Sequence, residues 1–282
     1  MPLMSNQNPW CLELKMKRES YFSGSFYPSE KDEINRYIEH FEKISSAHFD
    51  THMWQDKKIP AIVVPHAGYV YSGFTAHLAY RLLQLQAPKT VVVLGPSHHH
   101  YFKGMSLAMQ DTYETPLGSL DMDRELVNTL KEKFALSFDP KAHKEHSTEV
   151  QMPLIKHYLP QTKVIELVYS DINGKEIEPI LEYLVEREDL MIVISTDLSH
   201  FYTLQEAKVL DSICLDAFKK LNPKRLHEGC EACGILGLEA MMHVASKNGL
   251  HSEVLDYRTS ADASDDKESV VGYMSGIFEQ KG

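Results

Sequence analysis

The hydrophobic positions of the chain fall into short apolar runs that alternate with longer amphipathic segments. The short runs are rich in β-branched residues and close with turn signals, which is typical of strands in a sheet covered on both faces. They span residues 61–64, 90–94, 164–168 and 191–194. The longer segments place apolar residues three and four apart and predict helices over 30–44, 73–85, 124–134, 177–185, 204–221 and 234–246. The fold class is therefore α/β.

The end of the chain follows a different pattern. Residues 253–257 and 270–278 alternate like strands around the polar segment 260–269, and we expect them to form a sheet edge. No internal repeat and no long linker rich in Gly, Pro or Ser separates two parts of the sequence. We therefore expect one domain over residues 18–282, preceded by an N-terminal extension over 1–17.

Charge and composition exclude several classes of partner. The 282 residues include 29 Lys and Arg against 40 Asp and Glu, a net charge of −11 that disfavours nucleic acid and anionic membranes. No apolar stretch approaches the roughly 18 residues of a membrane-spanning helix. Residues 1–20 lack the apolar run of a secretory signal, so we expect a cytoplasmic protein. The cysteines at 11, 214, 230 and 233 are too few for a disulfide framework, and we expect thiols.

Histidines follow three of the apolar runs. His66 follows the first run, His98 the second and His200 the fourth. In an open α/β sheet the ligand site lies beyond the carboxyl ends of the strands, and imidazole is the commonest ligand for transition metals. A single histidine there is more often an ordinary hydrogen-bonded loop residue, but three together favour a metal or acid/base site. Asp197 is a candidate to orient one of these rings.

Other polar residues have weaker claims. His99 and His100 are neighbours of His98, and the three cannot all face one site. The sequence 146–149 resembles a helix start, with Ser147 as the cap and Glu149 in the first turn. His146 and Glu149 would share a helical face and are candidates to hydrogen-bond the metal ligands or relay a proton. The aromatic segment 21–28 is expected to pack on the core.

Cys230 and Cys233 have the spacing of a redox or zinc pair, but a single such pair excludes a four-cysteine zinc site. Their simplest interpretation is one buried structural thiol and one incidental thiol. Cys233 precedes Gly234 and a predicted helix, whose N-terminus favours a thiolate. Cys233 is therefore a candidate metal ligand, with Cys230 as its competitor.

Six motifs span nearly the whole chain: GSFY at 24–27, PHAGYVYSG at 65–73, GPSHH at 95–99, EHSTE at 145–149, STDLSH at 195–200 and ACG at 232–234. Taken together, they resemble those of the Memo family in order and spacing. The family is similar in fold to the class III nonheme-iron extradiol dioxygenases. The resemblance implies a single three-layer α/β/α domain around a central, mixed and largely buried sheet, with one metal pocket.

The resemblance also implies roles for particular residues. His66, His98 and Cys233 correspond to the family's metal ligands, and Asp197 and His200 to further polar pocket residues. The dioxygenases hold their metal with two histidines and a carboxylate, so a cysteine here replaces the carboxylate. A thiolate suits iron, copper(I) and zinc. Iron(II) is the expected cofactor, with copper or zinc as alternatives.

Three functions compete. The first is a metal-dependent, dioxygenase-like redox enzyme that acts on a phenolic or other small chelating molecule, with His200 as acid/base and Asp197 orienting it. The second is a non-catalytic signalling or scaffold protein whose pocket binds a peptide or a protein partner. The third and weakest is a zinc hydrolase, because two histidines and one cysteine leave a position for water.

Overall fold

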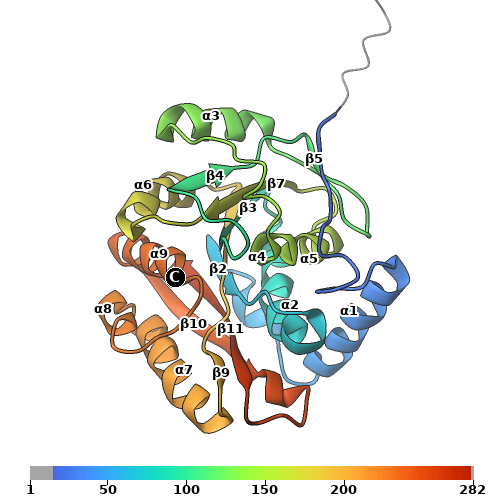
Figure 1. The fold of residues 1–282 in the computed structure, drawn as a ribbon, viewed down its shortest axis with the longest axis vertical. Helices are drawn as coiled ribbons and strands as arrows, with labels where there is room; N and C mark the ends of the chain where they lie inside the picture. The colour runs from blue at the N-terminus through green and yellow to red at the C-terminus, as the bar shows by residue number, and fades with distance from the viewer. Residues whose placement is uncertain (1–14, 281–282) are drawn as a thin grey trace, which may run out of the picture.

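The computed structural model describes residues 15–280 (Figure 1). Cys11 and most of the expected N-terminal extension lie outside the described residues. The main sheet has eight strands, seven of them in the order β10-β11-β2-β8-β3-β7-β4, and β9 (His200–Tyr202) pairs with β11. Its four parallel central strands are β2 (Ala61–Val64), β8 (Leu190–Ser195), β3 (Thr90–Pro96) and β7 (Lys163–Tyr169).

Antiparallel strands flank this parallel centre. They are β4 (Met105–Leu107) beside β7, and β11 (Val270–Gln280) beside β2 with β10 (Leu250–Thr259) outside it. The C-terminal strands were expected at a sheet edge, and for β11 this is wrong. Both neighbours of β11 hydrogen-bond to it, and most of its residues are buried. The edge position belongs to the half-buried β10.

Helices cover both faces of the sheet (Figure 1). Successive residues of β2 point to opposite faces: Ala61 and Val63 join one hydrophobic cluster, and Ile62 and Val64 join the other. The first cluster includes residues of α3 (Arg124–Phe134), α6 (Gly174–Val185), α7 (Leu204–Lys219), α8 (Pro223–Leu226) and α9 (Ile235–Lys247). The second includes residues of α1 (Lys31–Ser45), α2 (Tyr69–Gln86) and α5 (Gln151–Tyr158). The expected three-layer α/β/α architecture is confirmed.

Short elements complete the chain. A small sheet joins β1 (Lys17–Arg18), β5 (Thr112–Tyr113) and β6 (Leu120–Asp121), and two 3-10 turns span Thr51–Trp54 and Ser260–Asp262. The single-turn helix α4 covers His146–Glu149. Its cap is Glu145, whose carboxylate accepts a hydrogen bond from the backbone N–H of Ser147, so the expected Ser147 cap is wrong. None of the described helices is long and apolar enough to cross a membrane.

One expectation about the cysteines is also wrong. Cys214 of α7 and Cys230 form a disulfide with their Cα atoms 4.9 Å apart, rather than two thiols. α7 and α8 pack against each other, and this packing brings Cys230, four residues beyond α8, against the buried side of α7. The disulfide leaves Cys233 as the free cysteine of the described residues.

Candidate metal centre

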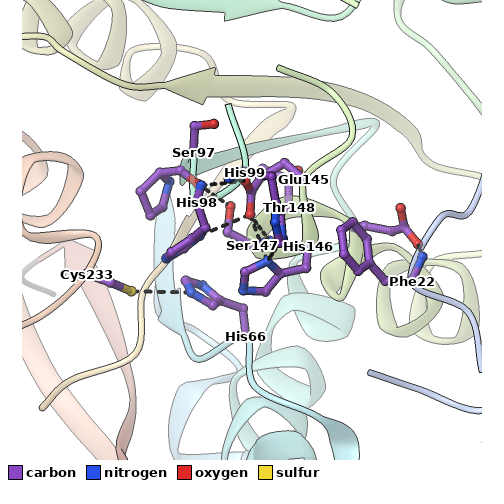
Figure 2. A network of polar contacts seen from close by, with 12 residues as sticks. Phe22, His66, Ser97, His98, His99, Glu145, His146, Ser147, Thr148 and Cys233 are labelled. Atoms are coloured by element: carbon purple, nitrogen blue, oxygen red, sulfur yellow. Dashed lines mark hydrogen bonds and ion pairs between the residues drawn. The ribbon is translucent and has the colours of Figure 1, made fainter. Parts of the chain in front are cut away.

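The candidate site lies where β2, β3 and β8 end. His66 follows β2, His98 follows β3, and the segment after β8 carries Asp197. Cys233 comes to the same place from the start of α9, because Gly234 packs directly on Thr196. A Cβ atom at position 234 would lie 2.6 Å from the Cβ of Thr196, so this approach requires glycine. Figure 2 shows Cys233 beside His66, with the rings of His98 and His146 next to it.

Hydrogen bonds fix the tautomer of His66. The Ser195 hydroxyl donates its proton to the carbonyl of Ser147 at 2.6 Å, so it must accept a hydrogen bond from Nδ1 of His66 at 3.0 Å. The lone pair of His66 is then on Nε2, which lies 3.3 Å from Sγ of Cys233. Burial, with the neighbouring His98 and His146 rings, lowers the pKa of His66 well below its ordinary value. His66 is therefore neutral, as a metal ligand must be.

The buried Glu145 carboxylate orients two further histidines. It lies 3.0 Å from Nδ1 of His98 and 3.0 Å from Nδ1 of His146, and it accepts the backbone N–H of His98 at 2.6 Å. Burial by itself would raise the pKa of Glu145, but the hydrogen bonds from His146 and His98 lower it strongly, so the group is ionised. A carboxylate bound to one ring nitrogen leaves the other nitrogen facing a metal.

His146 extends the candidate ligand set. Its ring centroid lies 4.6 Å from that of His98 and 5.4 Å from that of His66. One ligand nitrogen from each of the three rings lies within 4.8 Å of the others. Sequence reasoning gave His146 only an indirect role, whereas the structure groups it with His66 and His98.

Cys233 completes the arrangement. Its sulfur accepts the backbone N–H of Asp197 at 3.3 Å. Burial and the Asp197 carboxylate raise the pKa of the Cys233 thiol to about 12, so the group is protonated at neutral pH. Ligands about 2.1 and 2.3 Å from one ion lie roughly 3.1–3.6 Å apart. The 3.3 Å between Cys233 and His66 falls in this range.

Asp197 and His200 lie beside these residues. Asp197 is buried, and its carboxylate accepts the backbone N–H of His66 at 2.7 Å. Burial raises the pKa of Asp197. His200 lies in β9 and, with Asp197 and His146, lines a cavity of about 460 Å³ whose wall also includes Phe26, Tyr71 and Tyr273. The cavity adjoins the histidine cluster and is partly aromatic.

Glu149 has a different role from the one expected. Its carboxylate accepts hydrogen bonds from the backbone of Phe22 at 2.6 Å and from the Tyr27 hydroxyl at 2.8 Å, and it pairs with Arg18 at 2.7 Å. These contacts anchor the aromatic segment 21–28, and Phe26 of that segment lies 4.5 Å from the ring of His146. Glu149 thus binds the segment that carries Phe26 of the cavity wall, rather than a histidine of the cluster.

Sequence reasoning gave no role to Glu145, Ser195 or Arg18. The signal for Glu145 was its place directly before a helix start, where a carboxylate caps the backbone. Nothing in the local pattern marks Ser195 or Arg18, because their partners are distant in sequence.

A larger groove of about 730 Å³ lies at the opposite ends of β3 and β7, beside Thr90 and Lys163, and none of the candidate site residues line it.

The fold and site define a three-layer α/β/α protein with a histidine and cysteine cluster at the carboxyl ends of its central strands. Comparison with known proteins identifies its family. The Memo-like protein family matches residues 18–277, and the chain belongs to this family. It is 33% identical to a "MEMO1 family protein" of Aquifex aeolicus over 93% of this chain and 98% of that protein. It is 31% identical to a "MEMO1 family protein" of Archaeoglobus fulgidus over 93% of this chain and 99% of that protein.

Proposed function

We propose that this protein holds one transition-metal ion, iron(II), on His66, His98, His146 and Cys233, and uses it in a redox reaction of a small molecule with oxygen. The observation that carries the proposal is the lone pair of His66 Nε2, fixed by Ser195 and facing the Cys233 sulfur at 3.3 Å. Two atoms that both carry lone pairs, Nε2 of His66 and Sγ of Cys233, need either a shared proton or a cation between them at this distance.

The donor set fits such an ion. Neutral imidazoles and a thiolate are ligands of iron, copper and zinc. Glu145 orients His98 and His146, and Ser195 orients His66, which is the outer hydrogen bonding that metal-bound histidines have in proteins. The buried Glu145 charge offsets part of the charge of a divalent cation. Zinc would satisfy the same donors, so the identity of the metal is tested together with the activity.

When bound, iron(II) would supply the redox chemistry with oxygen that no side chain here provides. The protein's own residues bind and orient the substrate. The cavity wall of Phe26, Tyr71 and Tyr273 suits a flat, partly apolar molecule. His200 in the same wall is placed to accept a proton from a substrate hydroxyl. The Asp197 carboxylate accepts the backbone N–H of His66 and thereby fixes the position of this metal-binding residue.

Oxygen uptake tests this proposal. Protein loaded with iron(II) without oxygen is mixed with a panel of catechols and other chelating phenols, and oxygen consumption is followed with an electrode. We expect uptake that depends on substrate and metal and falls at least about 100-fold in His200→Ala, as for loss of a general acid or base. His227→Ala, an exposed histidine paired with Glu239 outside the site, is the matched control.

Uptake by His200→Ala equal to that of the wild type contradicts the acid/base role. Stoichiometric metal without any uptake contradicts the enzymatic proposal and favours the non-catalytic binding function.

A further inference from the structure

A second set of donor atoms lies on the outer side of the His146 ring. Nε2 of His99 lies 2.9 Å from Nδ1 of His146, and Nδ1 of His146 lies 3.0 Å from a carboxylate oxygen of Glu145. One donor atom from each of these three residues lies within 4.8 Å of the others. We propose that His99, Glu145 and His146 form a second divalent-cation site, beside the proposed centre and sharing His146 with it.

The distances suit a common ion. Two nitrogen or oxygen ligands about 2.1 Å from one cation lie roughly 3.0–3.4 Å apart for octahedral to tetrahedral angles. The separations of His99 and Glu145 from the shared nitrogen are 2.9 and 3.0 Å, which is just below and at the lower limit of this range. Both distances therefore need only a small increase for the two residues to share an ion with His146.

The charge of Glu145 is the second line of support. Its side chain is fully buried, and within residues 15–280 its ion-pair partners are His98 and His146, with no Lys or Arg. The other two buried glutamates nearby, Glu149 and Glu166, both pair with Arg18. A buried carboxylate needs a compensating positive charge. A cation held by His99, Glu145 and His146 provides it.

The outer site differs from the proposed centre in chemistry and access. It has two imidazoles and a carboxylate but no sulfur, so it suits zinc, iron(II) or manganese better than copper(I). His99 is exposed, which leaves room for water or a substrate oxygen on the ion. When both sites are filled, His146 binds through both ring nitrogens, and its remaining ring proton is released to solvent.

Zinc stoichiometry tests the inference. The inference rests on the proposed function only in that His146 is a ligand of both sites. The full chain is stripped with a chelator, dialysed against Zn²⁺ and analysed for metal per chain. We expect two ions in the wild type, one in His99→Ala and one in His66→Ala. The matched control is His100→Ala, whose ring pairs with Asp139 outside the cluster, and it should keep two.

Cobalt substitution identifies which ion is lost. A thiolate-to-cobalt charge-transfer band reports the Cys233 side, so it should persist in His99→Ala and vanish in His66→Ala. A single zinc in the wild type that His99→Ala retains overturns the second site. A single zinc lost in His99→Ala but kept in His66→Ala upholds it and overturns the proposed centre. Absence of bound zinc from every protein overturns both.

Discussion

The sulfur of Cys233 lies 3.3 Å from Nε2 of His66, although 167 positions separate the two residues in sequence. Asp197 joins them, because its backbone N–H binds the sulfur and its carboxylate binds the backbone N–H of His66. The end of β8 therefore fixes the start of α9 against the end of β2.

The first prediction separates the two candidate cysteines. Cys233→Ser should weaken metal binding by more than about 100-fold, since loss of even an outer hydrogen-bond partner costs 10–100-fold. Cys230→Ser removes the disulfide with Cys214 but leaves the donor set intact, so it should keep its metal. Competition with a chelator measures both affinities. Retention of metal by Cys233→Ser, with loss in Cys230→Ser, would reverse the assignment.

The second prediction concerns Glu145. Glu145→Gln removes the charge that orients His98 and His146, and metal affinity should fall about 10–100-fold. Asp139→Asn is the matched control, because Asp139 pairs with His100 outside the cluster. The same chelator competition applies, with circular dichroism to verify the fold. Equal affinities in the two variants would show that Glu145 does not orient the ligands.

The third prediction concerns the buried Arg18. It pairs with Glu149 at 2.7 Å and with Glu166 at 3.5 Å, and all three side chains are buried. Arg18→Met leaves two carboxylates without their cation, which should lower the free energy of unfolding by about 3–5 kcal/mol. Lys17→Met, whose side chain is exposed, should change it by less than about 1 kcal/mol. Urea unfolding compares them, and similar losses would refute a special role for Arg18.

The fourth prediction is a pH dependence. His77 is buried between Ser45 and Tyr158, and burial, with Arg81 nearby, lowers its pKa to about 3. Below the ordinary histidine pKa near 6.5 the unfolded chain binds a proton that the folded chain does not, so stability falls as pH falls. Between pH 6.5 and 5 the contribution is about 2 kcal/mol.

His77→Gln should show a correspondingly smaller loss of stability over this interval. Urea unfolding of metal-free protein at several pH values gives the difference between the two proteins. Parallel pH profiles for wild type and variant would mean that His77 does not titrate as its surroundings imply.

Much of the fold is readable in local patterns. The runs at 61–64, 90–94, 164–168 and 191–194 lie within β2, β3, β7 and β8, because strands buried on both faces need apolar residues throughout. The helix 124–134 has the expected bounds. Helix α2 begins at Tyr69, four residues before the expected start, since Tyr69 and Ser72 are buried by tertiary packing that the sequence pattern does not show.

The site was less predictable than the fold. His66 and His98 stand at strand ends, where topology alone brings them together. The pairing of Cys214 with Cys230 depends on how α7 and α8 pack, and the sequence had led us to expect thiols at both positions. The roles of Glu145 and Arg18 likewise depend on side-chain directions over long sequence separations. The assignment of metal ligands remains a prediction.

X-ray absorption of the zinc-loaded protein measures the central claim directly. We predict a sulfur neighbour near 2.3 Å and nitrogen neighbours near 2.0–2.1 Å. The sulfur neighbour should be absent from Cys233→Ser and present in Cys230→Ser. A wild-type spectrum with only nitrogen and oxygen neighbours, or a sulfur signal that survives Cys233→Ser, would contradict a metal centre built on His66 and Cys233.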